Sequence, residues 1–237
     1  MNCTKCNTEL TQNYCPNCGQ AAILKRIDSH YIIHEIEHVL HFERGILYTI
    51  KELCIHPGKT TRNYIKEDRN RLVKPVIFII VTSLIYTLIA HYFHIKEHVK
   101  MEGLENSSVA TFMHWSQANY GYSNILLGGF IAIWLQLFFK KYGYNFYEVL
   151  IMMCFILGIS MLIFAVFALL AGIFHFQSLI AAGVTGFIYL TWASANFFEK
   201  NKIGNYFKAF SAYLLGTITL YIVVFAVGLT IDYISKP

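Results

Sequence analysis

The chain has 237 residues, of which 56% are hydrophobic and 14% charged, with a formal net charge of +5. This composition is too apolar for an ordinary soluble domain. Residues 1–74 hold 11 of the 19 Lys and Arg residues, whereas 75–237 consists of long apolar runs with short polar connections. The sequence therefore divides into a water-facing segment and a membrane segment. We expect no cleavable signal peptide, because the first residues are polar and contain cysteines.

Four cysteines near the N-terminus form two pairs, each with two residues between its members: Cys3, Cys6, Cys15 and Cys18. Two such pairs joined by a short loop are typical of a zinc ribbon, because Zn²⁺ prefers four tetrahedral ligands. So short a segment cannot bury a core, so a structural Zn²⁺ cofactor would supply its folding free energy. We predict this ribbon over residues 1–24. Because its only charged residues are Lys5 and Glu9, we expect no nucleic-acid partner.

Residues 25–74 show helical periodicity, which predicts amphipathic helices at the cytoplasmic membrane surface over about 31–42, 46–55 and 60–68. The turn His56-Pro57-Gly58 is expected to end the second of them. Basic side chains near the first span are predicted to contact lipid headgroups, or only to enforce insertion with the positive side inside. They are Arg62, Lys66, Arg69, Arg71 and Lys74.

The first of these helices contains an H-E-x-x-H match at residues 34–38. In a metalloprotease, His34 and His38 would bind Zn²⁺ and Glu35 would polarise the bound water. The segment is rich in histidine, and no third ligand has an obvious motif. The same residues are therefore also typical of a second metal site, of a pH-responsive histidine face or of a plain polar helix face.

The membrane segment contains five stretches that are apolar enough to cross a bilayer. They are 75–93, 124–139, 149–174, 178–198 and 209–231, of which 178–198 is the most polar. With the N-terminus inside, segments 1–74, 140–148 and 199–208 would be cytoplasmic and carry 16 Lys and Arg, against 3 outside. This asymmetry predicts a cytoplasmic N-terminus and an outer C-terminus, which leaves the cysteines in a reducing compartment. The predicted fold class is an all-α multi-span membrane protein with a zinc-ribbon head and interfacial helices.

Several motifs in the first third of the chain resemble those of one family. They are the C-x2-C and Y-C-P-x-C-G-Q head, the stretch 47–53, His56-Pro57-Gly58-Lys59, Tyr64-Ile65, Arg69-x-Arg71 and Pro75. Over about residues 3–85 the chain resembles the DUF3667 family of uncharacterised bacterial integral membrane proteins with a zinc-ribbon-like head. The resemblance implies a bacterial inner-membrane location and this architecture, but no activity.

The function that these features favour is non-enzymatic: the zinc head recruits or senses a cytoplasmic or membrane protein, and the spans bind the bilayer. A closed site of four cysteines offers no open coordination position for catalysis. One alternative is a transporter or lipid-handling protein with the ribbon as a regulatory element. No Asp, Glu, Lys or Arg lies centrally in any predicted span, which disfavours ion-coupled transport. A further alternative is the metalloprotease with His34, Glu35 and His38, and an oligomer is compatible with all three.

Overall fold

The structure is a computed structural model that describes residues 45–69, 71–95, 107–174, 179–199 and 201–234, together with 2, 6, 8, 9, 16 and 17. The chain divides into two compact units, residues 1–43 and 44–237. In the first unit, Asn2 and Glu9 form an antiparallel bridge. The predicted helix over 31–42, with its H-E-x-x-H match, lies outside the described residues.

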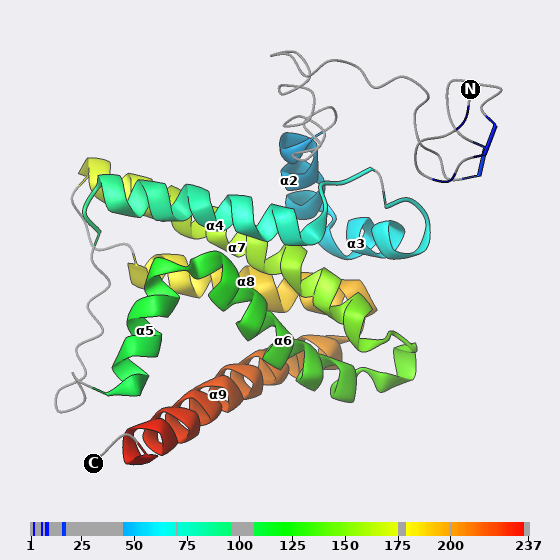
Figure 1. Cartoon of the computed structure of the whole chain (residues 1–237). Helices are drawn as coiled ribbons and strands as arrows, with labels where there is room; N and C mark the ends of the chain where they lie inside the picture. The colour runs from blue at the N-terminus through cyan, green and yellow to red at the C-terminus, as the bar shows by residue number, and fades with distance from the viewer. Residues whose placement is uncertain are drawn as a thin grey trace. The chain divides into compact units, whose positions relative to one another are not determined.

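The regular elements among the described residues of the second unit are all helices, which confirms the all-α prediction for this part of the chain (Figure 1). Two short helices come first, and long helices follow. Their bounds are α2 (Ile46–Ile55), α3 (Pro57–Lys66), α4 (Pro75–Tyr92), α5 (Ser108–Ala118), α6 (Tyr120–Phe138), η1 (Lys140–Tyr142), α7 (Phe146–Phe174), α8 (Leu179–Phe198) and α9 (Ile203–Ile234).

Helix α7 is the central helix of this unit. It packs against α4, α6 and α8 and also contacts α2 and α3. Its buried residues lie between Val149 and Ala168, and the ring of Phe155 lies 5.9 Å from that of Phe78 in α4. Helix α9 packs against α6, α8 and α5 instead, and it buries fewer of its residues. The core therefore lies along α7, where an apolar surface faces neighbours on several sides.

Four helices among the described residues are long and apolar enough to cross a membrane, namely α4, α6, α7 and α9. Their exposed apolar side chains, such as Leu84, Ile133 and Val223, suit contact with lipid. The predicted span 178–198 is the helix α8, which is not one of these four. The structure therefore supports a membrane protein, with α8 as a further long helix of the same bundle.

The long helices extend beyond the apolar stretches that predicted them. Helix α7 begins at Phe146 rather than at 149, because Asn145 and Glu148 cap each other's backbone N–H groups at 2.9 Å each. Helix α6 begins at Tyr120 rather than at 124, and the Ser123 hydroxyl donates to the carbonyl of Asn119 at 3.0 Å. Polar residues can continue a helix past the apolar core of a span, so hydropathy marks only the middle of each helix.

The connections between the helices gather at two ends of the bundle. At one end, Tyr144 packs against Phe197, with ring centroids 4.6 Å apart, and Lys66 lies 5.1 Å from the Tyr144 ring centroid. At the other end, the Asp232 carboxylate accepts a hydrogen bond from the backbone N–H of Ser108 at 2.9 Å. The predicted cytoplasmic segments thus meet at one end, and two predicted outer segments meet at the other.

Candidate functional site

Helix α3 contacts the C-terminal end of α8 through a glycine. A Cβ atom added at Gly58 would meet the backbone carbonyl of Asn196 and would lie 2.6 Å from the backbone nitrogen of Phe197. A larger side chain at position 58 would force the two backbones apart. Gly58 belongs to the motif His56-Pro57-Gly58-Lys59, so the motif has a packing role. We take this contact and the polar residues around it as the candidate functional site.

The same motif determines where α3 begins. Helix α2 ends at Ile55, and Pro57 is the first residue of α3, so His56 alone connects them. Proline suits a first helical position, because the N–H that it lacks has no partner there. The predicted end of the second helix at His56-Pro57-Gly58 is therefore correct. The following helix was expected from residue 60 and starts earlier, because the proline begins a helix here as well as ending one.

Arg62 joins α3 to the last turn of α8. Its Nη1 donates to the carbonyl oxygens of Asn196 and Phe197, both at 2.6 Å. Carbonyls in the last turn of a helix lack intrahelical donors and carry the negative end of the helix dipole. The guanidinium therefore caps the C-terminus of α8, because it supplies hydrogen-bond donors to these carbonyls. Arg62 is half-buried, whereas the other four basic residues predicted at the headgroups are exposed.

Helix α3 packs one face against the bundle, and its opposite face, with Lys59 and Lys66, is exposed. Six of its ten residues are buried, and the Tyr64 ring packs edge-on against Phe155 of α7 at 5.1 Å. Burial raises the pKa of the Tyr64 hydroxyl, and the charge of Arg69 offsets part of that rise. Among the described residues, the buried hydroxyls of Thr61, Thr191 and Ser194 have no hydrogen-bond partner.

Helix α2 is fixed at two further points. The Tyr189 hydroxyl of α8 donates to the carbonyl of Leu53 at 3.0 Å, and the Val73 N–H donates to the Thr49 hydroxyl at 3.2 Å. Leu53 is itself fully buried. These contacts link α2 both to α8 and to the connection that precedes α4. The segment from 46 to 73 is therefore held against the bundle along its length.

A pocket of about 300 Å³ opens between α2, α3 and the connection that follows α3. Its lining carries both signs of charge: the carboxylates Glu52, Glu67 and Asp68 and the cations Lys59 and Arg71. Six uncharged or weakly basic residues complete the lining: Tyr48, His56, Thr60, Asn63, Tyr64 and Leu72. This arrangement suits a small polar ligand that itself carries both charges.

Tyr48 holds the guanidinium of Arg71 at the edge of this pocket. The Arg71 Nε donates to the Tyr48 hydroxyl at 2.7 Å, and the guanidinium carbon lies 5.4 Å from the Tyr48 ring centroid. Elsewhere in the lining, the Thr60 hydroxyl donates to the Glu52 backbone carbonyl at 3.3 Å. Side chains that are fixed before a ligand arrives lose little entropy on binding it.

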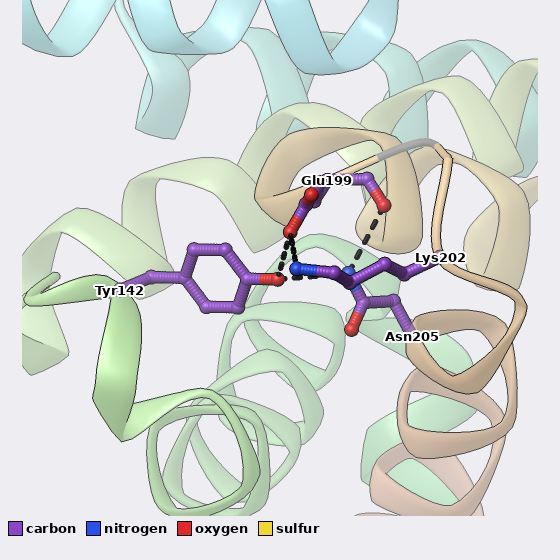
Figure 2. A network of polar contacts seen from close by, with 4 residues as sticks. All are labelled: Tyr142, Glu199, Lys202 and Asn205. Atoms are coloured by element: carbon purple, nitrogen blue, oxygen red, sulfur yellow. Dashed lines mark hydrogen bonds and ion pairs between the residues drawn. The ribbon is translucent and has the colours of Figure 1, made fainter.

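A second polar network lies where α8 leads into α9 (Figure 2). Glu199 accepts a hydrogen bond from the Tyr142 hydroxyl at 2.8 Å and pairs with Lys202 at 2.8 Å. Asn205 donates both to the Tyr142 hydroxyl and to the Glu199 backbone carbonyl, each at 3.0 Å. The hydrogen bonds from Lys202 and Tyr142 lower the pKa of Glu199, and Glu199 raises the pKa of Lys202. The network ties η1 to the start of α9.

The predicted zinc ligands fall largely beyond what the structure describes. Cys3, Cys15 and Cys18 lie outside the described residues, as do His34, Glu35 and His38. The thiol sulfur of Cys6 lies 3.3 Å from the Thr8 hydroxyl oxygen. Within the described residues, no three His, Cys, Asp or Glu side chains form a group that could hold a metal ion. The zinc-ribbon prediction therefore stays a prediction.

Residues 43–87 match the family model described as "Protein of unknown function (DUF3667)". The predicted resemblance to the DUF3667 family is thereby confirmed over this segment. It contains α2, α3 and most of α4, and with them every residue that lines the pocket. No curated protein matches the chain. No solved structure matches it either.

Sequence reasoning missed several residues that the structure brings together. It singled out the motif at 56–59 without assigning its glycine a contact, since no local pattern names α8 as the partner of α3. The network of Tyr142, Glu199 and Asn205 joins residues up to 63 positions apart, and no spacing rule links them. Gly143 is a local sequence signal near this network. Its φ of 74° is one that glycine adopts readily, and it marks a turn directly after η1.

Proposed function

We propose that this chain is a non-enzymatic, five-span protein of the bacterial inner membrane whose cytoplasmic zinc head recruits a protein partner. The observation that carries this proposal is the attachment of α2 and α3 to the bundle through Gly58, Arg62 and Tyr189. These contacts fix the segment that follows residues 1–43 along the chain. A binding module suits attachment to such a fixed segment, because a rigid support reduces the entropy lost on association.

Two features of the first unit support a zinc head. An antiparallel bridge pairs Asn2 with Glu9, and the sequence between them contains the first C-x2-C pair. A C-x2-C pair between two bridged residues suits a site in which both sulfurs bind one ion. The Thr8 hydroxyl near the Cys6 sulfur is the kind of neighbour that stabilises a thiolate ligand. With four thiolates bound, the ion would have a structural role only.

The fifth span of this proposal is α8. It packs between α7 and α9, and its 20 residues would measure about 30 Å, the thickness of the hydrocarbon layer. One face of α8 exposes Ile180, Val184 and Ile188, at 80%, 54% and 61% of their surface. In water this apolar stripe would be unfavourable, whereas in lipid it is well solvated. Lipid contact along α8 is therefore the simpler interpretation.

The proposed orientation has the N-terminus in the cytoplasm and the C-terminus outside. Its support is that Lys66, Tyr144 and Phe197, from three segments at or next to the predicted cytoplasmic side, are neighbours at one end of the bundle. An excess of Lys and Arg on that side agrees with the positive-inside rule. An odd number of crossings then leaves the C-terminus on the opposite side.

The recruitment function is tested by purifying the intact protein and a variant that lacks residues 1–24 under the same mild conditions. We expect one protein to co-purify with the intact chain and to be lost from the shortened chain. A Cys54→Ser variant, which changes a cysteine outside the head, should retain the partner. Recovery of the same proteins with both chains would contradict the proposal.

A further inference from the structure

The pocket between α2, α3 and the connection that follows α3 is lined by charges of both signs. Lys59 and Glu67 both line it, yet neither forms an ion pair with a described residue. Its cations number two and its carboxylates three, so the lining is close to neutral overall. A purely anionic ligand would meet three carboxylates, and a purely cationic one would meet Lys59 and Arg71. The lining therefore favours a ligand that carries both charges.

The position of the pocket suggests where such a ligand comes from. Leu72, at its edge, lies two residues before Lys74, the N-cap of α4. Helix α4 is a candidate span that begins at Pro75, so the pocket lies within a few residues of the membrane surface along the chain. Lipid headgroups are present at high local concentration at that level.

We propose that this pocket binds a phosphodiester that carries a primary ammonium group, as in the headgroup of an aminophospholipid. The phosphate would bind Arg71, whose Nε is already held by Tyr48, together with Lys59. Guanidinium groups bind phosphate oxygens through charge-assisted hydrogen bonds. The ammonium would donate to the carboxylates of Glu52 and Glu67, which also line the pocket. This site is independent of the head and of its partner.

The proposal predicts a specific preference among headgroups. A primary ammonium donates hydrogen bonds to carboxylates, whereas a quaternary ammonium has no N–H to donate. The phosphoethanolamine headgroup should therefore be preferred over phosphocholine, although the two have equal net charge. An anionic headgroup without an amine should bind more weakly still, because the carboxylates repel it.

The experiment uses the full chain, delipidated in detergent and titrated with phosphatidylethanolamine, phosphatidylcholine or phosphatidylglycerol, with retained lipid counted by native mass spectrometry. We expect about one phosphatidylethanolamine per chain and about tenfold weaker retention in Arg71→Gln or Lys59→Gln. The matched control is Lys51→Gln. It removes one positive charge from an exposed side chain of α2 that does not line the pocket. Thermal unfolding in detergent checks that each variant is folded.

The outcomes separate the proposal from general charge attraction. Equal retention of the three lipids, or an equal loss in Lys51→Gln and Arg71→Gln, would overturn it. Soluble glycerophosphoethanolamine distinguishes the source of the ligand. If it binds as tightly as the lipid and with the same dependence on Lys59, the site holds a free solute of the proposed chemistry. If it binds much more weakly, the acyl chains contribute and the ligand is a membrane lipid.

Discussion

Gly58 lies at the closest approach of α3 to α8, with the Asn196 carbonyl where a side chain would be. We predict that Gly58→Ala lowers the free energy of unfolding by about 1–3 kcal/mol, because a backbone carbonyl cannot move aside as a flexible side chain can. Thermal unfolding of the protein in detergent measures the change.

Gly129 of α6 provides the matched control, because a Cβ atom added there meets nothing within 4 Å. Alanine has a higher helix propensity than glycine, so Gly129→Ala should raise stability by up to about 1 kcal/mol. Opposite signs for the two substitutions would support the docking of α3. Two equal shifts would mean that Gly58 has no special contact.

Arg62 contributes two hydrogen bonds to the C-terminal carbonyls of α8, both at 2.6 Å. We predict that Arg62→Gln lowers the free energy of unfolding by about 1–3 kcal/mol and speeds proteolysis within α3, since carbonyls of α8 lose a charged donor. The exposed Arg69 offers a comparison: Arg69→Gln should change stability by less than about 0.5 kcal/mol. Arg62 and Arg69 variants of equal stability would argue against the capping role.

The pair Glu199 and Lys202 makes a prediction about pH. The pKa of Glu199 is lowered from 4.5. The stability that its carboxylate contributes to the folded state is therefore present above that pH and is lost as the pH falls through the lowered pKa. The pKa of Lys202 is raised from 10.5, so its contribution is present below that value and is lost as the pH rises through the raised pKa. Stability from this pair should therefore be constant across neutral pH.

Carbon NMR of the labelled Glu199 carboxyl group measures this pKa directly. In Tyr142→Phe the pKa should move upwards towards its ordinary value, because one of the two hydrogen bonds that lower it is lost. In Lys202→Gln it should rise further, since the hydrogen bond from Lys202 has the larger effect. A pKa that is the same in all three proteins would mean that the network does not form in solution.

At the scale of the helix, local sequence predicted some boundaries and not others. The predicted helix at 46–55 coincides with α2, because glycine before it and proline after it stop the apolar repeat. Helix α9 was expected from residue 209 and begins at Ile203. Its first turn is anchored by Asn205, whose side-chain amide donates to the Tyr142 hydroxyl. That anchor lies far away in sequence, so the apolar pattern could not include it.

The prediction about membrane topology concerns α8. If α8 crosses the membrane, a reporter inserted at 176 will be outside and one inserted at 201 will be cytoplasmic. Two kinds of reporter measure this, one active only in the cytoplasm and the other only outside it. Each is inserted in turn at both positions. If both positions report the same side, α8 does not cross, and the protein has four spans rather than five.

Residues 140–145 provide a second readout for that experiment. Tyr144 packs against Phe197 and Tyr142 bonds Glu199, so an insertion near 140 should report the same side as one at 201. This expectation requires that α8 crosses, because α7 is a candidate span and puts 176 on the opposite side from 140. Opposite sides for 140 and 201 would mean that α8 does not cross.

At the scale of the whole molecule, the chain has two compact units, and zinc should affect only the first. We predict about one zinc per chain by atomic emission, lost in a Cys3→Ser, Cys6→Ser double variant and retained in Cys54→Ser. Chelation should leave the thermal unfolding of the helical unit unchanged, because the metal supplies folding free energy only to the head. A second zinc per chain that is lost in His34→Ala would instead support the metalloprotease alternative.

The sequence by itself determined that the protein is helical and apolar enough for a membrane, and it identified the family segment, since composition and periodicity are local properties. Only the tertiary structure decided that α3 is buried against α8, that Arg62 caps that helix, and that charges spread over residues 52–71 line one pocket. The physical reason is that the residues next to a glycine or an arginine in the sequence do not indicate which distant residue it contacts. Its role arises when packing along α7 brings distant segments to the same end of the bundle.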